Sequence, residues 1–142
     1  QSLLTGGEVH GMHVKVIAER HSQWVTNGRV VMRGQSVEFG PGRNWIRQRV
    51  TNLRPGAAYE LMGMFRVDSG AEDGLRIDSP NGRTLRSEVV SGNAPYWERR
   101  TLRFTTAPDQ TEVLIYAESR STDRDLAYVD DMGLQWCVDQ ES

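Results

Sequence analysis

The alternation of apolar and polar residues constrains the fold of this chain more than any other feature of its sequence. It predicts short β-strands nearly throughout, and no amphipathic helical pattern persists for three turns. Turn residues punctuate the strands, as in Ser79-Pro80-Asn81-Gly82. The pattern is typical of an all-β protein, and we expect an antiparallel two-sheet β-sandwich, a jelly roll. The predicted strands are Val14–Ala18, Arg29–Met32, Ser36–Phe39, Trp45–Val50, Ala58–Val67, Gly74–Asp78, Arg86–Val90, Trp97–Thr105, Thr111–Glu118 and Leu126–Leu134.

The size and composition of the chain indicate a single domain over residues 1–142. A length of 142 residues supports one hydrophobic core and not two, and 37% apolar with 25% charged residues exclude a disordered tail. No apolar run is long enough to span a bilayer, so we expect no membrane partner. The single Cys137 excludes an internal disulfide and a cysteine-cluster metal site. Residues 1–6 lack a basic start and an apolar core, so we expect no signal peptide there.

The charge of the chain argues against nucleic acid as a partner. Residues 29–54 hold six arginines and one glutamate, but the net charge of the whole chain is −2. A nucleic-acid binder usually combines a basic patch with overall basicity, which this chain does not have.

Three predicted strands carry large side chains on the face that points away from the core. Alternation with a period of two places the core-facing residues of each strand on one side. The other side carries an aromatic residue or a methionine beside charged residues. An outer sheet face is normally small and polar, so if the strands are neighbours they form an apolar platform with a charged rim. Sugars fit such a surface, because a pyranose packs its C–H face on an aromatic ring while rim groups bind its hydroxyls. The candidate ligand-binding residues are Trp45, Arg47, Arg49, Met64, Arg66, Tyr116 and Glu118. The alternative is that the chain's own loops cover this face.

Three motifs in order carry a family resemblance. They are Asn52–Tyr59 (NLRPGAAY), Trp97 followed by Leu102–Thr106 (LRFTT), and Ala127–Leu134 (AYVDDMGL). Together they resemble carbohydrate-binding modules of the jelly-roll, galactose-binding-like type, with families 4, 9, 16 and 22 the most similar. The resemblance covers about residues 29–136, and its weight lies in the ordered combination of the motifs.

The resemblance implies a non-catalytic, extracellular domain that targets an attached enzyme to a polysaccharide. In family 22-like modules a tryptophan before a Q-x-V strand and a Y-x-E pair line the cleft, and Trp45 and Tyr116-Ala117-Glu118 match these positions. The implied ligand is a neutral β-linked hemicellulose or glucan, such as xylan. Outward arginines instead favour a uronic-acid polysaccharide such as glucuronoxylan, alginate or pectin, because the guanidinium fork matches a carboxylate.

The resemblance also implies a structural calcium ion. Its ligands would be Glu8, a carbonyl at Gln35 or Ser36, and Asp130, which together offer the hard oxygens that calcium binds. The alternative is that Asp130 and its neighbour Asp131 form a solvated turn.

Other chemistries find less support in the sequence. On a strand, His10 and His13 face opposite ways, so they do not form a metal site. Glu112 and Glu118 lie about 20 Å apart along one strand, too far for an acid pair that cleaves glycosides. No nucleophile motif is present, so we expect no enzyme. The remaining alternative is a β-sandwich that contacts protein as an adhesion or structural domain. Trp24 is predicted to lie in a loop and is a candidate for the wall of the cleft.

Overall fold

The computed structural model describes residues 8–9, 12–16, 24–33, 36–121 and 124–137. These residues form β-strands and turns, and no helix among them is long and apolar enough to cross a membrane. The strands are β1 (Glu8–Val9), β2 (Met12–Val16), β3 (Val25–Asn27), β4 (Val30–Arg33), β5 (Ser36–Phe39), β6 (Gly42–Val50), β7 (Ala58–Val67), β8 (Ala71–Asp78), β9 (Thr84–Ser91), β10 (Glu98–Thr105), β11 (Val113–Ser121) and β12 (Ala127–Cys137).

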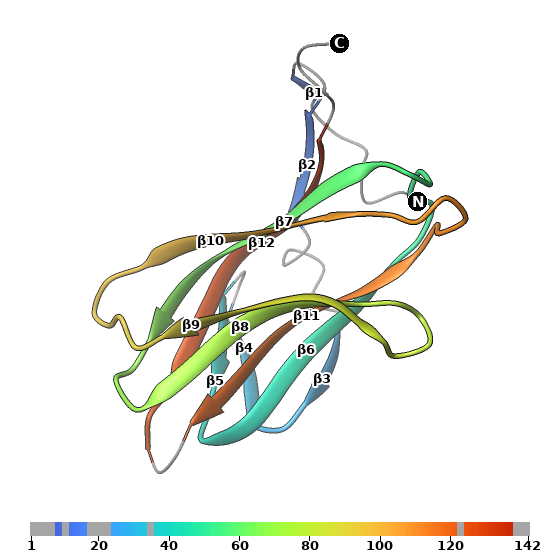
Figure 1. The fold of residues 1–142 in the computed structure, drawn as a ribbon. Coiled ribbons are helices and arrows are strands. Elements are labelled where there is room, and N and C mark those ends of the chain that lie inside the picture. Colours follow the sequence, from blue (N-terminus) through green and yellow to red (C-terminus); the bar gives the residue numbers. More distant parts are fainter. Residues whose placement is uncertain (1–7, 10–11, 17–23, 34–35, 122–123, 138–142) are drawn as a thin grey trace.

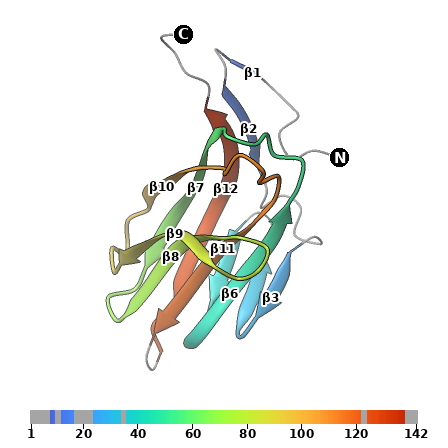
Figure 2. The same ribbon diagram turned by 45° about the vertical axis from the view of Figure 1, so that its right-hand side comes forward.

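Two antiparallel sheets form the two layers of the molecule (Figures 1 and 2). One sheet has five strands in the order β3-β6-β11-β8-β9. The other has seven strands, with β12 in its middle: β7 pairs with one edge of β12, and β5 and β2 share the other edge. The β10 strand pairs with β7, and β4 with β5. The expected all-β antiparallel sandwich is thereby confirmed.

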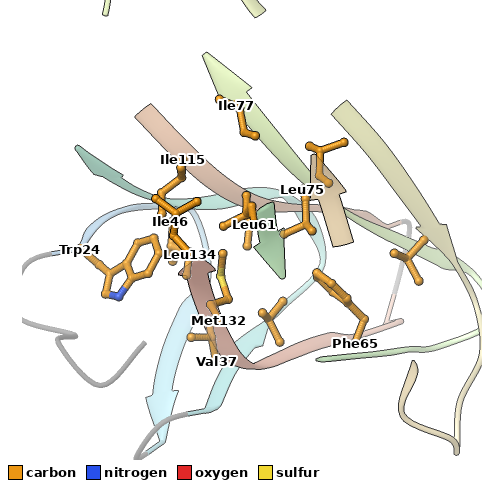
Figure 3. Packing of buried hydrophobic residues seen from close by; sticks show 14 of the residues in the cluster. Trp24, Val37, Ile46, Leu61, Phe65, Leu75, Ile77, Ile115, Met132 and Leu134 are labelled. Atoms are coloured by element: carbon orange, nitrogen blue, oxygen red, sulfur yellow. The ribbon is translucent and has the colours of Figure 1, made fainter. Parts of the chain in front are cut away.

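The core lies between the two sheets and is filled from both (Figure 3). Leu61 and Phe65 enter it from β7, and Ile115 enters it from β11, each with no exposed surface. Their alternation with outward residues follows from the two-residue period of a strand. Trp24 is also part of this core, with 7% of its surface exposed, so it does not form the wall of a cleft.

The predicted strands agree with the observed ones except for their exact ends and for two short strands at the edges of the sheets. Two short strands, β1 and β3, lacked a pattern of their own in the sequence. β12 continues to Cys137, where it pairs with β2 and β7, and a bulge lies within it between Asp130 and Gly133. Asp131 there adopts a φ of 51°, and the extra residue lets both Val129 and Met132 face the core.

The first of the three motifs builds the turn that leads into β7. Leu53 is buried, and Gly56 takes a φ of 67°, which glycine adopts without strain. The Tyr59 hydroxyl accepts a hydrogen bond of 2.8 Å from the backbone N–H of Arg54. The buried hydroxyl of Thr106, the last residue of the second motif, donates to the Arg54 carbonyl over 2.7 Å. The two motifs are therefore parts of one hydrogen-bonded corner.

Candidate ligand-binding site

The outer face of the five-stranded sheet carries side chains in straight cross-strand rows. One row runs through Asn27, Trp45, Glu118, Gly74 and Val89, which are consecutive partners on β3, β6, β11, β8 and β9. Side chains opposite each other in such a ladder lie close enough to touch. The row therefore places an aromatic ring and a carboxylate side by side in the middle of the sheet.

The next row brings a second aromatic ring between two arginines. It runs through Val25, Arg47, Tyr116, Arg76 and Ser87. This register joins residues that are far apart in the sequence. Four of the predicted ligand-binding residues lie together in the two rows: Trp45, Arg47, Tyr116 and Glu118. Arg49 follows on the same face of β6, one row further along.

A groove with a volume of about 510 Å³ lies over the first row. Gly74 contributes to its lining from β8, between β11 and the edge strand β9, and by alternation any other residue there would carry its side chain on this face. A Cβ atom at Gly74 would lie 2.6 Å from the carbonyl oxygen of Glu88, so the close approach of β9 also requires glycine. The groove is lined by Asn27, Arg43, Asn44, Trp45, Glu72, Asp73, Gly74, Arg76, Ser87, Glu88, Val89, Glu118, Ser119 and Arg120.

The two aromatic rings of the face differ in how accessible they are. Trp45 is partly exposed, and its ring meets that of Tyr116 edge-on at 5.6 Å between centroids. Tyr116 is 6% exposed, because the guanidinium of Arg76 lies 3.8 Å from its ring centroid. Arg47 lies 5.1 Å from the centroid of the Trp45 ring. Trp45 is thus the ring available for stacking, and Tyr116 supports it from the side.

Carboxylates neutralise most of the arginines on this face. Arg76 donates to Glu118 over 2.7 Å and lies 3.3 Å from a carboxylate oxygen of Asp78. Burial raises the pKa of Glu118, and Asp78 adds to this effect, while the positive charge of Arg76 opposes it. Outside the centre, Arg49 pairs with Glu112. Arg120 likewise pairs with Glu72, over 2.8 Å.

Met64 and Arg66 lie on the opposite side of the molecule. Both are on β7, which belongs to the seven-stranded sheet, and their side chains alternate with the core residues Phe65 and Val67. The prediction that Met64 and Arg66 belong to one binding site with Trp45 is therefore wrong, because β7 does not neighbour β6 or β11. Period two assigns a residue to a face of its own strand, but it does not say which strands are neighbours.

The structure separates two of the predicted calcium ligands. Glu8 pairs with His13 on β2, and His13 pairs with Trp136, which is six residues beyond Asp130 along β12. At ~3.3 Å per residue this is about 20 Å. Figures 1 and 2 show β1 at the far end of the sandwich. Ser36 does lie near Asp130, because its neighbour Val37 pairs with Val129.

The predicted ligand set does not fit a calcium ion as a whole. Asp130 uses one carboxylate oxygen to accept a hydrogen bond from the backbone N–H of Asp131, over 2.8 Å. The carbonyl candidate at Gln35 lies outside the described residues. Within the described segments, no cluster of three His, Cys, Asp or Glu side chains could hold a metal.

Sequence reasoning missed Arg76 and Gly74, although both had a signal. Alternation along Gly74–Asp78 puts Arg76 on the outer face, opposite Leu75 and Ile77. A glycine inside a predicted strand often marks a close backbone approach, as it does here. Neither signal could be used without knowing that β8 is the strand next to β11.

Comparisons by sequence find no relative, since no protein-family model and no curated protein match the chain. Comparison of structures finds similar folds. A family 61 carbohydrate-binding module, solved with β-1,4-galactotriose, is 19% identical over 82% of this chain and 90% of that one, with a TM-score of 0.64. A family 4 carbohydrate-binding module is 18% identical over 80% and 86% of the two chains, with a TM-score of 0.66.

A third similar structure contains a catalytic module as well. It holds the CBM22-1 and GH10 modules of the Clostridium thermocellum endo-1,4-β-D-xylanase 10B with xylohexaose, and it is 14% identical, with a TM-score of 0.59. The match covers 87% of this chain and 28% of that one. The described chain is therefore a β-sandwich with the fold of the jelly-roll carbohydrate-binding modules.

Proposed function

We propose that this chain is a non-catalytic carbohydrate-binding module whose groove holds a neutral β-linked polysaccharide, of the hemicellulose or glucan type. The observation that carries the proposal is the groove over the row of Trp45, Glu118 and Gly74. A pyranose unit would pack its C–H face on Trp45, and Glu118, which keeps free lone pairs beside Arg76, would accept its hydroxyl hydrogens. Gly74 leaves room for the ring.

The pairing of charges favours a neutral ligand over an acidic one. Arg49, Arg76 and Arg120 already bind carboxylates of the chain, so an incoming uronate would have to compete with partners that are fixed in place. Hydroxyl groups of a neutral sugar can bind to the remaining donors and acceptors without breaking these pairs.

A uronic-acid polysaccharide is the second candidate for the groove, and one observation favours it. Arg43 and Arg47 lie on the same face, and neither has a carboxylate partner among the residues that the structure describes. Ionic strength separates the two candidates, because salt screens exposed charge pairs within about 10 Å at 0.1 M and leaves stacking almost unchanged. We expect binding at 0.5 M NaCl to match binding at 0.05 M, and a loss of affinity at high salt would favour the acidic ligand.

The central test is the substitution Trp45→Ala. We expect it to weaken binding to the preferred polysaccharide by about 2 kcal/mol, or about thirtyfold, because truncating a central aromatic removes the stacking surface. Affinity gel electrophoresis with xylan, mixed-linkage glucan, alginate and pectin identifies the ligand and measures the change.

Val31→Ala is the control, because it removes an exposed apolar side chain from β4 of the other sheet. It should bind the groove ligand as the parent does. Equal binding by the Trp45→Ala variant and the parent would show that the groove is not the site. An interface with another protein would instead appear as binding to no glycan at all, with complex formation through the exposed Val25 and Val89 on either side of the groove.

We further propose that the module acts outside the cell and is joined to a catalytic domain of a longer protein. The family 22 module and the xylanase module in one of the similar structures support this arrangement. A tether of this kind would raise the local concentration of the enzyme at its substrate without any new contact to the reacting bond.

A structural calcium ion stays a prediction from the family resemblance, but Glu8 and Asp130 are too far apart to bind it together. If calcium binds the native state, a chelator should lower the melting temperature, because a ligand that binds only the folded protein stabilises it by mass action. Thermal melting in calcium and in EGTA measures this effect, with magnesium as the control. An unchanged midpoint would exclude the ion as a stabilising ligand.

A further inference from the structure

The outer face of the seven-stranded sheet holds an arginine between two aromatic rings. The guanidinium carbon of Arg66 lies 4.3 Å from the centroid of the Tyr128 ring and 5.4 Å from that of the Trp97 ring. Arg66 and Tyr128 are cross-strand partners on β7 and β12, and Trp97 directly precedes β10, which pairs with the other edge of β7. The rings fix the position of the positive charge.

Arg66 differs from Arg76 and Arg120 of the groove in having no acidic partner among the described residues. No described residue accepts a hydrogen bond from its guanidinium or forms an ion pair with it, whereas Arg76 binds two carboxylates. The carboxylate of Glu38, opposite Tyr128 in the ladder, pairs with Arg33. The ring contacts engage no oxygen or nitrogen acceptor, so the N–H donors of Arg66 are left for a ligand.

The loop that carries the exposed aromatic residues is held in place. Asn93 accepts a hydrogen bond of 2.7 Å from the backbone N–H of Val67, and its side-chain amide donates to the Phe65 carbonyl over 3.3 Å. Tyr96 and Trp97 follow, and they are 75% and 39% exposed. Trp97 lies beside the fixed arginine, and two consecutive exposed large aromatic side chains are unusual for a solvent face.

The nearby charges are of both signs. Arg99 is exposed on β10 and pairs in register with Met64, and Asp130 is the partner of Met64 on the other side. Arg99 donates to the sulfur of Met62 over 3.4 Å and has no ion pair with a described residue. Asp130 and Arg99 are thus on either side of Met64, which separates the two charges.

We propose that this face is a second glycan-binding site, specific for a uronate-bearing polysaccharide. The Arg66 guanidinium would bind the uronate carboxylate through two parallel N–H donors, and Trp97 and Tyr96 would pack on the sugar rings beside it. Arg99 would contact a neighbouring uronate of the same chain. This site lies on the other sheet from the groove, and the proposal does not depend on what the groove binds.

The experiment compares two forms of one polymer, de-esterified polygalacturonate and its fully methyl-esterified form, which differ in the carboxylate charge. We expect the parent to bind the de-esterified form more tightly, and Arg66→Gln to lower this affinity at least about tenfold, since glutamine cannot bind the carboxylate as a charged fork. Trp97→Ala should also weaken binding. Arg83→Gln, in the exposed turn after β8, is the matched arginine control, and Trp45→Ala tests the groove.

The proposal stands if Arg66→Gln loses affinity while Arg83→Gln and Trp45→Ala do not, with all melting temperatures equal to that of the parent. It fails if polygalacturonate does not bind, or if both forms of the polymer bind equally. It also fails if the two arginine variants lose affinity equally, which would mean general charge attraction. Loss of binding in Trp45→Ala alone would move the acidic ligand to the groove.

Discussion

Replacing Tyr59 by alanine is expected to destabilise the fold by about 3–5 kcal/mol, the range for deleting a buried aromatic side chain. The ring is 1% exposed and stacks on Phe104 at 5.8 Å between centroids. Its hydroxyl holds the turn at Arg54. A domain of this size has a total stability of only about 5–15 kcal/mol, so the loss removes a large part of it. Urea unfolding measures the change.

Tyr59→Phe divides this loss into its two parts. Phenylalanine keeps the stacking on Phe104 and removes only the acceptor for the Arg54 N–H, which costs about 1 kcal/mol. If phenylalanine destabilised the protein as much as alanine does, the hydrogen-bonded corner and not the packing would hold β7. A loss below 1 kcal/mol for alanine would contradict both roles.

Asp73→Asn is expected to make the protein more stable at pH 8 and to leave its stability near pH 4 unchanged. Asp73 is 2% exposed, and one of its carboxylate oxygens has no hydrogen-bond partner among the described residues. Burial raises the pKa of this carboxyl group well above its usual value, and the charge of Glu118 adds to the shift, while the N–H of Gly74 opposes it. Asparagine keeps the acceptor for that N–H and carries no charge.

The sign of the effect follows from proton binding in the two states. The native state keeps the proton of Asp73 at pH values where the unfolded chain, with a pKa near 3.9, has released it. The unfolded state then binds fewer protons, so the free energy of unfolding falls as the pH rises above 4 toward the native pKa. Asparagine removes this slope, and each pKa unit of the shift corresponds to about 1.4 kcal/mol.

Thermal melting from pH 4 to pH 8 measures this difference. Asp109→Asn is the control, because Asp109 is exposed in a turn, and its curve should run parallel to that of the parent. Parallel curves for Asp73→Asn and the parent would contradict a buried, protonated carboxyl group. Lower stability of Asp73→Asn at every pH would show that the carboxyl group makes contacts that the amide cannot replace.

Local pattern was enough to predict the fold class and the faces of most strands. The core positions of β7 and β11 follow from alternation, and the turn motif before Tyr59 marks a real corner of the structure. The pairing of Trp45 with the β11 residues Tyr116 and Glu118 was accessible only through the resemblance to known modules. Strand neighbours depend on contacts between distant segments, which a period along one strand does not encode.

The errors have the same origin. Alternation groups Arg66 with Trp45 because both side chains point away from the core, yet the two residues lie on different sheets. Arg76 shows an equally clear alternation, but its strand carries no aromatic residue, which is the feature that marks the other strands as part of a binding face. The short β1 and β3 strands gain their structure from their partners rather than from local propensity.

The open floor of the groove at Gly74 has a consequence for how the ligand preference of the groove can change during evolution. Outward positions such as Trp45, Arg47 and Val89 alternate with the core, so mutations there can alter what the groove binds with little effect on folding. Gly74 is different, because any side chain would both fill the groove and strike the Glu88 carbonyl. New specificities should therefore arise by exchange of the walls of the groove, while its floor is inherited unchanged.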